Sequence, residues 1–269
     1  MNEILLYFGF TLVGAVTLRT LRIARRYTAV LAPGESIFSQ NHKTSWSINL
    51  PIGLTCWPTE VCARVCYAAL LSSAARWIKS IKKQLRVYAF LKQVSPEKAA
   101  HRIYADYHRL PIRNRPPFIR IAAVGDLFLE LVLAINAFLR RYPTVPVWVV
   151  TRKPNMVALL DRDADSLVVN FSLDASPESA DRMEQVLALG HPSVMFSYLR
   201  TRADDLVPPC ASIIYNLQQS TRLPDFDDPR LCPADARLIP REGACLSGDP
   251  RCQRCFSTTV LTKHHERRV

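Results

Sequence analysis

The feature that most constrains the fold is an alternation of short apolar runs and longer amphipathic segments between residues 118 and 217. The apolar runs predict strands at 118–123, 145–150, 167–173, 194–199 and 211–217. Helices are predicted between them at 127–141, 155–161 and 176–189, and Ser176-Pro177-Glu178 and Gly190 mark the ends of the last one. Strands that alternate with helices indicate βαβ units, so we expect an α/β fold with a parallel sheet.

Polar residues follow the predicted strands closely. Asp126, Thr151, Lys153 and Asp174 each come just after one of them. Right-handed crossovers bring the carboxyl ends of parallel strands to one edge, and chemistry in such folds is found at that edge. Each residue taken alone also fits a helix cap or a loop contact. Their joint placement predicts a functional site.

A cysteine-containing segment precedes the strand series. Cys56, Cys62 and Cys66 have the spacing Cys-x5-Cys-x3-Cys, after a loop with Pro51, Gly53 and Pro58. Cys62 and Cys66 are predicted to share one face of a helix, and Cys56 to fold back over the helix start, where amide dipoles favour a thiolate. Three thiolates are too few for structural zinc but suit a 4Fe–4S cluster with one open iron. The alternative is three buried or disulfide-linked cysteines.

The end of the chain holds a second set of cysteines. From residue 208 the sequence is rich in Pro, Asp and Arg, and it contains Cys232, Cys245, Cys252 and Cys255. Four thiolates bound to a metal can stabilise a loop-rich segment that lacks a core of its own. The spacing is compatible with zinc and with a second 4Fe–4S cluster. Cys210 is predicted to be a buried free thiol.

Charge and hydrophobicity restrict the class of protein. The chain has 269 residues, 49% of them hydrophobic, and a net charge of +12. This balance supports a folded core and contact with an anionic partner such as nucleic acid, a membrane surface or a phosphorylated substrate, although a solvated basic surface explains it equally well. A helix predicted over 67–91 carries basic residues suited to a phosphate backbone: Arg76, Lys79, Lys82, Lys83 and Arg86.

The amino-terminal region is apolar from Ile4 to Leu18. This run is short for a membrane span and lacks the preceding positive charge of a signal peptide, so we do not expect a membrane as a partner and expect a cytoplasmic location. It remains open whether the run anchors the protein, packs on the domain or reflects an upstream start. We predict three parts: an extension and linker (1–40), an α/β domain (41–217) and a cysteine-rich segment (218–269).

Several motifs resemble those of a known family. Lys43-Thr44-Ser45-Trp46-Ser47, Leu50-Pro51, the three cysteines with Tyr67-Ala68, Gly125-Asp126 and Thr151-Arg152-Lys153 resemble the phage gene product 88 family, found in phages and mobile elements. More loosely they resemble radical S-adenosylmethionine proteins. The resemblance covers roughly residues 40–256 and implies a partial (β/α) barrel with a 4Fe–4S cluster at Cys56, Cys62 and Cys66. The usual radical S-adenosylmethionine spacing is Cys-x3-Cys-x2-Cys, which this chain does not have.

Two functional hypotheses follow. The first is an iron–sulfur enzyme of radical S-adenosylmethionine type with an unknown substrate and electron donor. In it Asp126 or Asp174 binds the ribose hydroxyls of the cofactor, and Lys153 or Arg152 its carboxylate. The second is a non-catalytic, metal-stabilised protein that binds nucleic acid. The sequence contains no phosphate-binding Gly-x4-Gly-Lys-Ser/Thr loop, no Gly-x-Gly-x2-Gly and no Gly-x-Ser-x-Gly.

Overall fold

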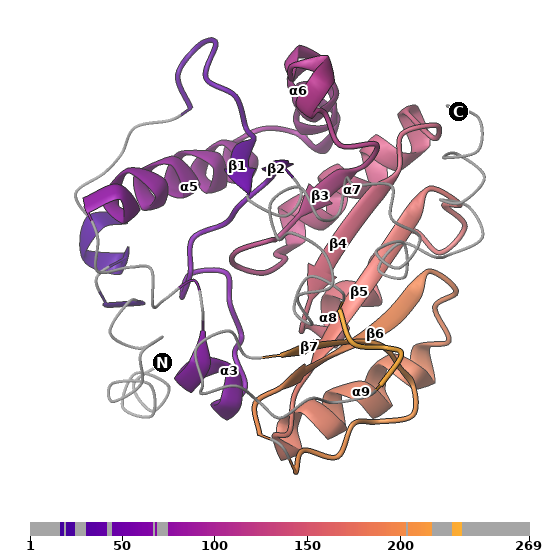
Figure 1. Cartoon of the computed structure of the whole chain (residues 1–269). Helices are drawn as coiled ribbons and strands as arrows, with labels where there is room; N and C mark the ends of the chain where they lie inside the picture. Colours follow the sequence, from indigo (N-terminus) through magenta and orange to yellow (C-terminus); the bar gives the residue numbers. More distant parts are fainter. Residues whose placement is uncertain are drawn as a thin grey trace.

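The fold is built on a five-stranded parallel sheet, seen in a computed structural model of the chain (Figure 1). The model describes residues 17–18, 20–24, 31–41, 45–66, 68, 75–202, 204–216 and 228–232. The strands lie in the order in which they occur in the chain: β3 (Ile119–Ile121), β4 (Val147–Thr151), β5 (Leu167–Leu173), β6 (Val194–Arg200) and β7 (Ala211–Asn216). Each strand therefore pairs with the next one in parallel.

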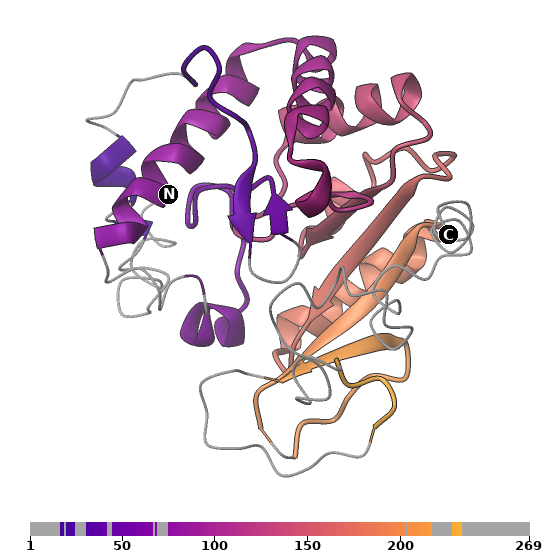
Figure 2. The same ribbon diagram turned by 45° about the horizontal axis from the view of Figure 1, so that its top comes forward.

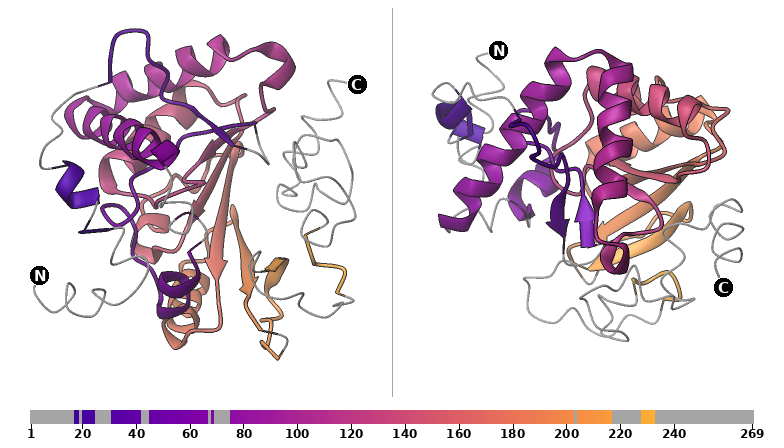
Figure 3. Two further views of the ribbon diagram at one scale, coloured as in Figure 1. Left: turned by 60° about the vertical axis from the view of Figure 1, so that its left-hand side comes forward. Right: turned by 90° about the horizontal axis from the view of Figure 1, so that it is seen from above.

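Helices pack together on one face of this sheet (Figures 2 and 3). They are α5 (Ala75–Gln93), α6 (Pro96–Arg109), α7 (Leu129–Arg141), α8 (Pro154–Val157) and α9 (Pro177–Leu189). Their buried side chains join those of alternate strand residues, such as Val147, Val149 and Phe171, in one hydrophobic core. Successive strand side chains point to opposite faces, so Trp148 and Asn170 belong to the other face.

The predicted elements are confirmed within a few residues. Helices confined to one face, with strands in sequential order, are the arrangement from which a (β/α) barrel is built. The described strands form an open sheet, however, and closure into a partial barrel stays a prediction. The α/β class with a parallel sheet is therefore the part of the predicted fold that the structure bears out.

One edge of the sheet is extended by the chain that leads into the cysteine segment. Ile48 forms a parallel bridge with Ile121, and the Leu50 amide donates to the Val124 carbonyl at 2.9 Å. Just before it, β1 (Ser39–Asn41) and β2 (Ser45–Ser47) pair in antiparallel fashion. The last residues of the predicted extension and linker (1–40) belong to the fold, because Ile37 and Phe38 are buried in the core and Ser39 and Gln40 pair with β2.

The opposite edge carries the single described cysteine of the carboxyl-terminal set. Leu231 bridges Ile214 in parallel, and the Cys232 amide donates to the Ile214 carbonyl at 2.8 Å. Cys245, Cys252 and Cys255 lie outside the described residues, as does most of the apolar run at 4–18. Within the described ranges, no helix has both the length and the apolar character to cross a lipid bilayer.

Candidate functional site

The candidate site is the loop 51–59 and the short helix α3 (Glu60–Val65), which carry the three cysteines to the carboxyl edge of the sheet. Gly125 allows this approach. Its φ is +79°, and a Cβ atom there would lie 2.6 Å from the Leu50 Cβ and 2.7 Å from the Leu50 carbonyl oxygen. A side chain at this position is thus excluded both by backbone conformation and by the neighbouring strand.

Two polar contacts hold the loop on the first two strand ends. The Asp126 amide, after β3, donates to Thr55 Oγ1 at 3.0 Å. The Lys153 ammonium group, after β4, donates to the Thr55 carbonyl and to the Leu127 carbonyl. Thr55 directly precedes Cys56, so these bonds fix the backbone at the first thiol.

Two further contacts come from the next strand and helix. Thr59 Oγ1 donates to Asp174 Oδ2 at 2.5 Å, and Asp174 directly follows β5. The Arg182 guanidinium of α9 donates to the Trp57 carbonyl at 2.8 Å and stacks on the Trp57 ring, 4.8 Å from its centroid. The loop is therefore held by residues that follow three consecutive parallel strands and by the helix after the third.

Helix α3 begins at a capping residue and ends before the last cysteine. Thr59 is the N-cap, and its Oγ1 accepts from the Cys62 amide at 3.1 Å. The helix stops at Val65, and Cys66 has φ −57° and ψ 106°, outside the helical region. Because its φ of −57° is still helical, Cys66 as the C-cap can lie on the same face as Cys62, and the shared face predicted for the two thiols stays a prediction.

The three thiols are reduced and partly buried. Burial raises the pKa of Cys56 far above its ordinary value, although a Gly53 backbone hydrogen bond opposes the change. Burial likewise raises the pKa of Cys62 to about 11, against the favourable charge of Arg152. The pKa of Cys56 is also raised by Cys66 and Cys62, and that of Cys62 by Cys66, so the three thiols lie within electrostatic range of one another.

A preformed metal-binding arrangement is not found among the residues that the structure describes: no group of three or more His, Cys, Asp or Glu side chains is placed to hold an ion. The thiols of Cys56 and Cys62 are protonated at neutral pH, since the pKa of each is raised. Binding of a metal or cluster would therefore release protons and turn the side chains toward the ion.

Behind the thiols lies a charged network that includes two of the predicted site residues. Asp126 accepts from Thr151 Oγ1 at 2.6 Å and from the Arg152 amide at 3.3 Å, and burial raises its pKa. The Arg152 guanidinium donates to Asp174 Oδ2 at 2.5 Å. Although burial opposes it, Arg152 lowers the pKa of Asp174, which is therefore ionised at neutral pH.

These contacts bear on the residues predicted to bind a cofactor. Asp126 and Lys153 form hydrogen bonds within the protein, and these bonds hold the loop in place. Asp174 also has internal partners but lines a cavity. Cofactor binding by the three residues stays a prediction.

Several residues of this site were not predicted. Thr55, Trp57, Thr59 and Arg182 hold the loop, yet none belongs to the cysteine pattern. The N-cap role of Thr59 was recognisable, because Thr followed by Glu at the start of a helix is a common capping pattern. Arg182 lies within an ordinary amphipathic helix, and no sequence pattern around it indicates that it contacts the loop.

The basic helix face predicted on α5 is smaller in the structure than in the sequence. Lys83 donates to the Phe38 carbonyl, and Arg86 pairs with Glu35. Lys79 and Lys82 remain exposed. Contact of this helix with nucleic acid stays a prediction.

The fold and the site together define an α/β protein whose reduced cysteines are held at the carboxyl edge of a parallel sheet. The chain matches the model of the gene product 88 family over residues 22–258. It therefore belongs to the gene product 88 family. No curated protein and no solved structure matches it. The looser resemblance to radical S-adenosylmethionine proteins receives no support from the family match and stays a prediction.

Proposed function

We propose that this protein is an iron–sulfur enzyme that holds a 4Fe–4S cluster at Cys56, Cys62 and Cys66. One observation carries the proposal: three reduced thiols lie in a single loop and helix at the carboxyl edge of a parallel sheet, where α/β proteins place their chemistry. Residues after three successive strands hold this loop, which is more support than a surface loop without function requires.

The donor set fits such a cluster in kind and number. Thiolates are the ligands that iron–sulfur clusters prefer, and three of them leave one iron open to a small molecule. The nearby Arg152 offsets negative charge that would build up at the site. When bound, the cluster supplies single electrons to the molecule at the open iron, which in the radical S-adenosylmethionine hypothesis is S-adenosylmethionine.

The protein's own residues have defined parts in this proposal. Thr55 and Thr59 fix the backbone on both sides of Cys56 through Asp126 and Asp174. Trp57, stacked on Arg182, covers the loop from the α9 side. We further propose that Cys232, Cys245, Cys252 and Cys255 hold a second 4Fe–4S cluster or a zinc ion.

The experiment is metal analysis of the protein purified without oxygen, with electron paramagnetic resonance after reduction. About eight irons per chain are expected for two clusters, and about four for one cluster with zinc at the second site. Cys62→Ala should remove the first cluster and its resonance. Cys210→Ala is the matched control, because Cys210 contacts Met183 and lies outside both cysteine sets. Wild-type protein with zinc and no iron would refute the proposal.

The alternative, a metal-stabilised protein that binds nucleic acid without catalysis, has one supporting observation, the net charge of +12. Such binding is largely electrostatic and falls steeply with salt. A filter-binding titration with duplex DNA at two salt concentrations tests it, with Lys79→Ala/Lys82→Ala beside the wild type. Binding that does not depend on salt or on the two lysines would argue against this surface.

A further inference from the structure

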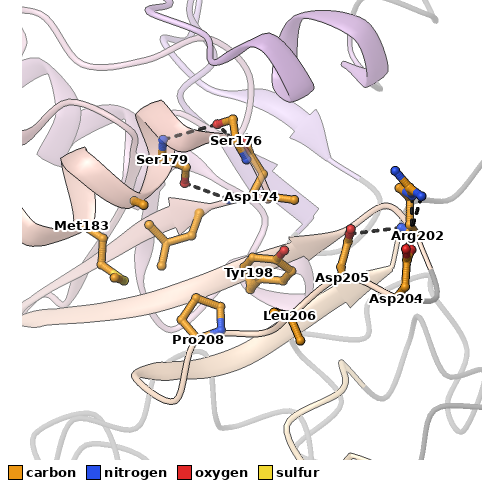
Figure 4. Close-up of a pocket in the computed structure, with 13 residues that line it drawn as sticks. Asp174, Ser176, Ser179, Met183, Tyr198, Arg202, Asp204, Asp205, Leu206 and Pro208 are labelled. Atoms are coloured by element: carbon orange, nitrogen blue, oxygen red, sulfur yellow. Dashed lines mark hydrogen bonds and ion pairs between the residues drawn. The ribbon is translucent and has the colours of Figure 1, made fainter.

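A cavity of about 360 Å³ lies at the carboxyl ends of β5 and β6, beside the cysteine site (Figure 4). Its wall includes Asp174, the residue that also binds Thr59 and Arg152 of the cysteine site. The two features therefore share one carboxylate. A molecule in this cavity would lie next to the loop that carries the thiols.

Tyr198 supplies the first sign that the cavity receives a ligand. Its side chain is 1% exposed, and its hydroxyl has no hydrogen-bond partner among the described residues. Figure 4 shows this hydroxyl on the cavity side of the ring, between Asp174 and Asp205. A buried hydroxyl without a hydrogen-bond partner lowers the stability of the fold. A bound ligand that accepts a hydrogen bond from it would remove this free-energy cost.

Asp205 supplies the second polar group. Its three hydrogen bonds, from Thr201 Oγ1 and from the amides of Thr201 and Arg202, all reach Oδ2. Among the described residues the other oxygen, Oδ1, has no hydrogen bond and can accept from a ligand. A ligand hydroxyl can both accept from Tyr198 and donate to a carboxylate. Three aspartates and one arginine line the cavity, and Arg202 already pairs with Asp204, so a phosphate or carboxylate would meet repulsion from Asp205.

The opposite wall of the cavity is apolar. Leu173, Met183, Leu206 and Pro208 line it. Leu206 is 91% exposed, an unusual state for a large apolar side chain at a cavity rim. Burial of this side chain by an apolar part of a ligand would be favourable.

From these contacts we infer that the cavity is the substrate site of the proposed enzyme and takes an uncharged molecule, with hydroxyl groups on one side and a flat apolar part on the other, of the size of a nucleoside. The hydroxyls bond to Tyr198 and Asp205, and the apolar part packs on Leu206 and Met183. That the bound molecule is a substrate rests on the proposed function. That the cavity binds such a molecule follows from its lining residues alone.

Isothermal titration calorimetry on the full-length protein tests the inference, with adenosine, uridine, adenosine 5′-monophosphate and D-ribose as probes. At least one nucleoside should bind saturably. The monophosphate should bind at least tenfold more weakly because of its charge, and ribose because it lacks the apolar part. Absence of binding by both nucleosides, or equal binding of the nucleoside and its monophosphate, would overturn the inference.

Two variants locate the binding in this cavity. Tyr198→Phe should weaken nucleoside binding about tenfold, while the unfolding midpoint stays the same or rises, because the lost hydroxyl has no partner among the described residues. Leu206→Ser should weaken binding severalfold. Tyr142→Phe is the matched control, because its hydroxyl pairs with His101 on α6. Equal affinity of Tyr198→Phe and the wild type would refute the inference.

Iron analysis of the same preparation separates this inference from the proposed function. Protein that contains iron but binds no nucleoside refutes the cavity assignment alone. Protein without iron that binds a nucleoside through Tyr198 refutes the iron–sulfur proposal and retains the binding site.

Discussion

Two buried aspartates, Asp106 in α6 and Asp174 after β5, have the same immediate chemistry and different surroundings. The side chains of both are 0% exposed, and both pair with arginine. Asp106 accepts from the Ile37 amide, from Arg102 at 2.8 Å and from Arg109 at 3.0 Å. Asp106 therefore holds the chain before β1 against α6.

Asp174 joins the cysteine loop to the sheet and also borders the cavity, where the Tyr198 hydroxyl has no hydrogen-bond partner within the described part of the chain. A buried ion pair is therefore no sign of function by itself, because it occurs in both regions. The functional inference comes from the groups next to the Arg152–Asp174 ion pair, which are the reduced thiols of the loop and the Tyr198 hydroxyl of the cavity.

The largest expected effect is on stability at Asp106. Asp106→Asn leaves the partly exposed Arg102 beside a neutral partner and removes the buried charge that the Ile37 amide binds, so it should lower the free energy of unfolding by about 4 kcal/mol. Urea denaturation measures this loss. Iron per folded chain should not change. A loss of iron equal to that in Cys62→Ala would show that the two regions are coupled and break the comparison.

Gly125 and Gly34 give a matched pair, one in each region. Their φ angles are +79° and +80°, but a Cβ at Gly125 would meet Leu50, whereas at Gly34 it would meet nothing within 4 Å. Gly34→Ala should cost about 1 kcal/mol through backbone strain, and Gly125→Ala about 3 kcal/mol through strain and overlap. Denaturant midpoints compare them. Equal losses would mean that Leu50 moves away readily.

The reactivity of Cys62 tests the charges at the carboxyl edge. Burial raises the pKa of Cys62 from 9.0 to about 11, so less thiolate is present at pH 8, and iodoacetamide should react about 100-fold more slowly than with an ordinary thiol. The rate should rise with pH up to about 11. Mass spectrometry of the metal-free protein follows the modification.

Arg152 and Arg102 sharpen this test. Arg152 favours the Cys62 thiolate, so Arg152→Gln should slow the reaction further. Arg102→Gln, beside Asp106, should leave the rate unchanged. A faster reaction in Arg152→Gln would contradict the assigned electrostatics.

The smallest effect is expected at two helix caps. Thr59 and Ser95 cap α3 and α6, and each side chain accepts a hydrogen bond from a backbone amide. Thr59→Val and Ser95→Ala should each cost about 1 kcal/mol. Thr59 also donates to Asp174, so its loss should in addition lower the iron content. Thr59→Ser should restore it. Equal iron in Thr59→Val and the wild type would place the Thr59–Asp174 bond outside the function of the site.

Regular elements were predictable because local patterns encode them. Ser176 caps its helix as predicted, and the five parallel strands lie within a few residues of the apolar runs. Asp126, Thr151, Lys153 and Asp174 reach the expected edge, since parallel strands must end together. The β1–β2 pair and the early end of α3 at Val65 were missed, because both depend on packing and carry weak local signals.

The sequence by itself determined the alternation of elements, the edge at which the polar residues meet and the supply of three thiols close together in the chain. Only the tertiary structure decided what these groups do: Asp126 and Lys153 hold backbone, and Asp174 stands between a thiol loop and a cavity. The physical reason is distance along the chain. Thr59 and Asp174 are 115 residues apart in sequence, and no local pattern records a hydrogen bond across that separation.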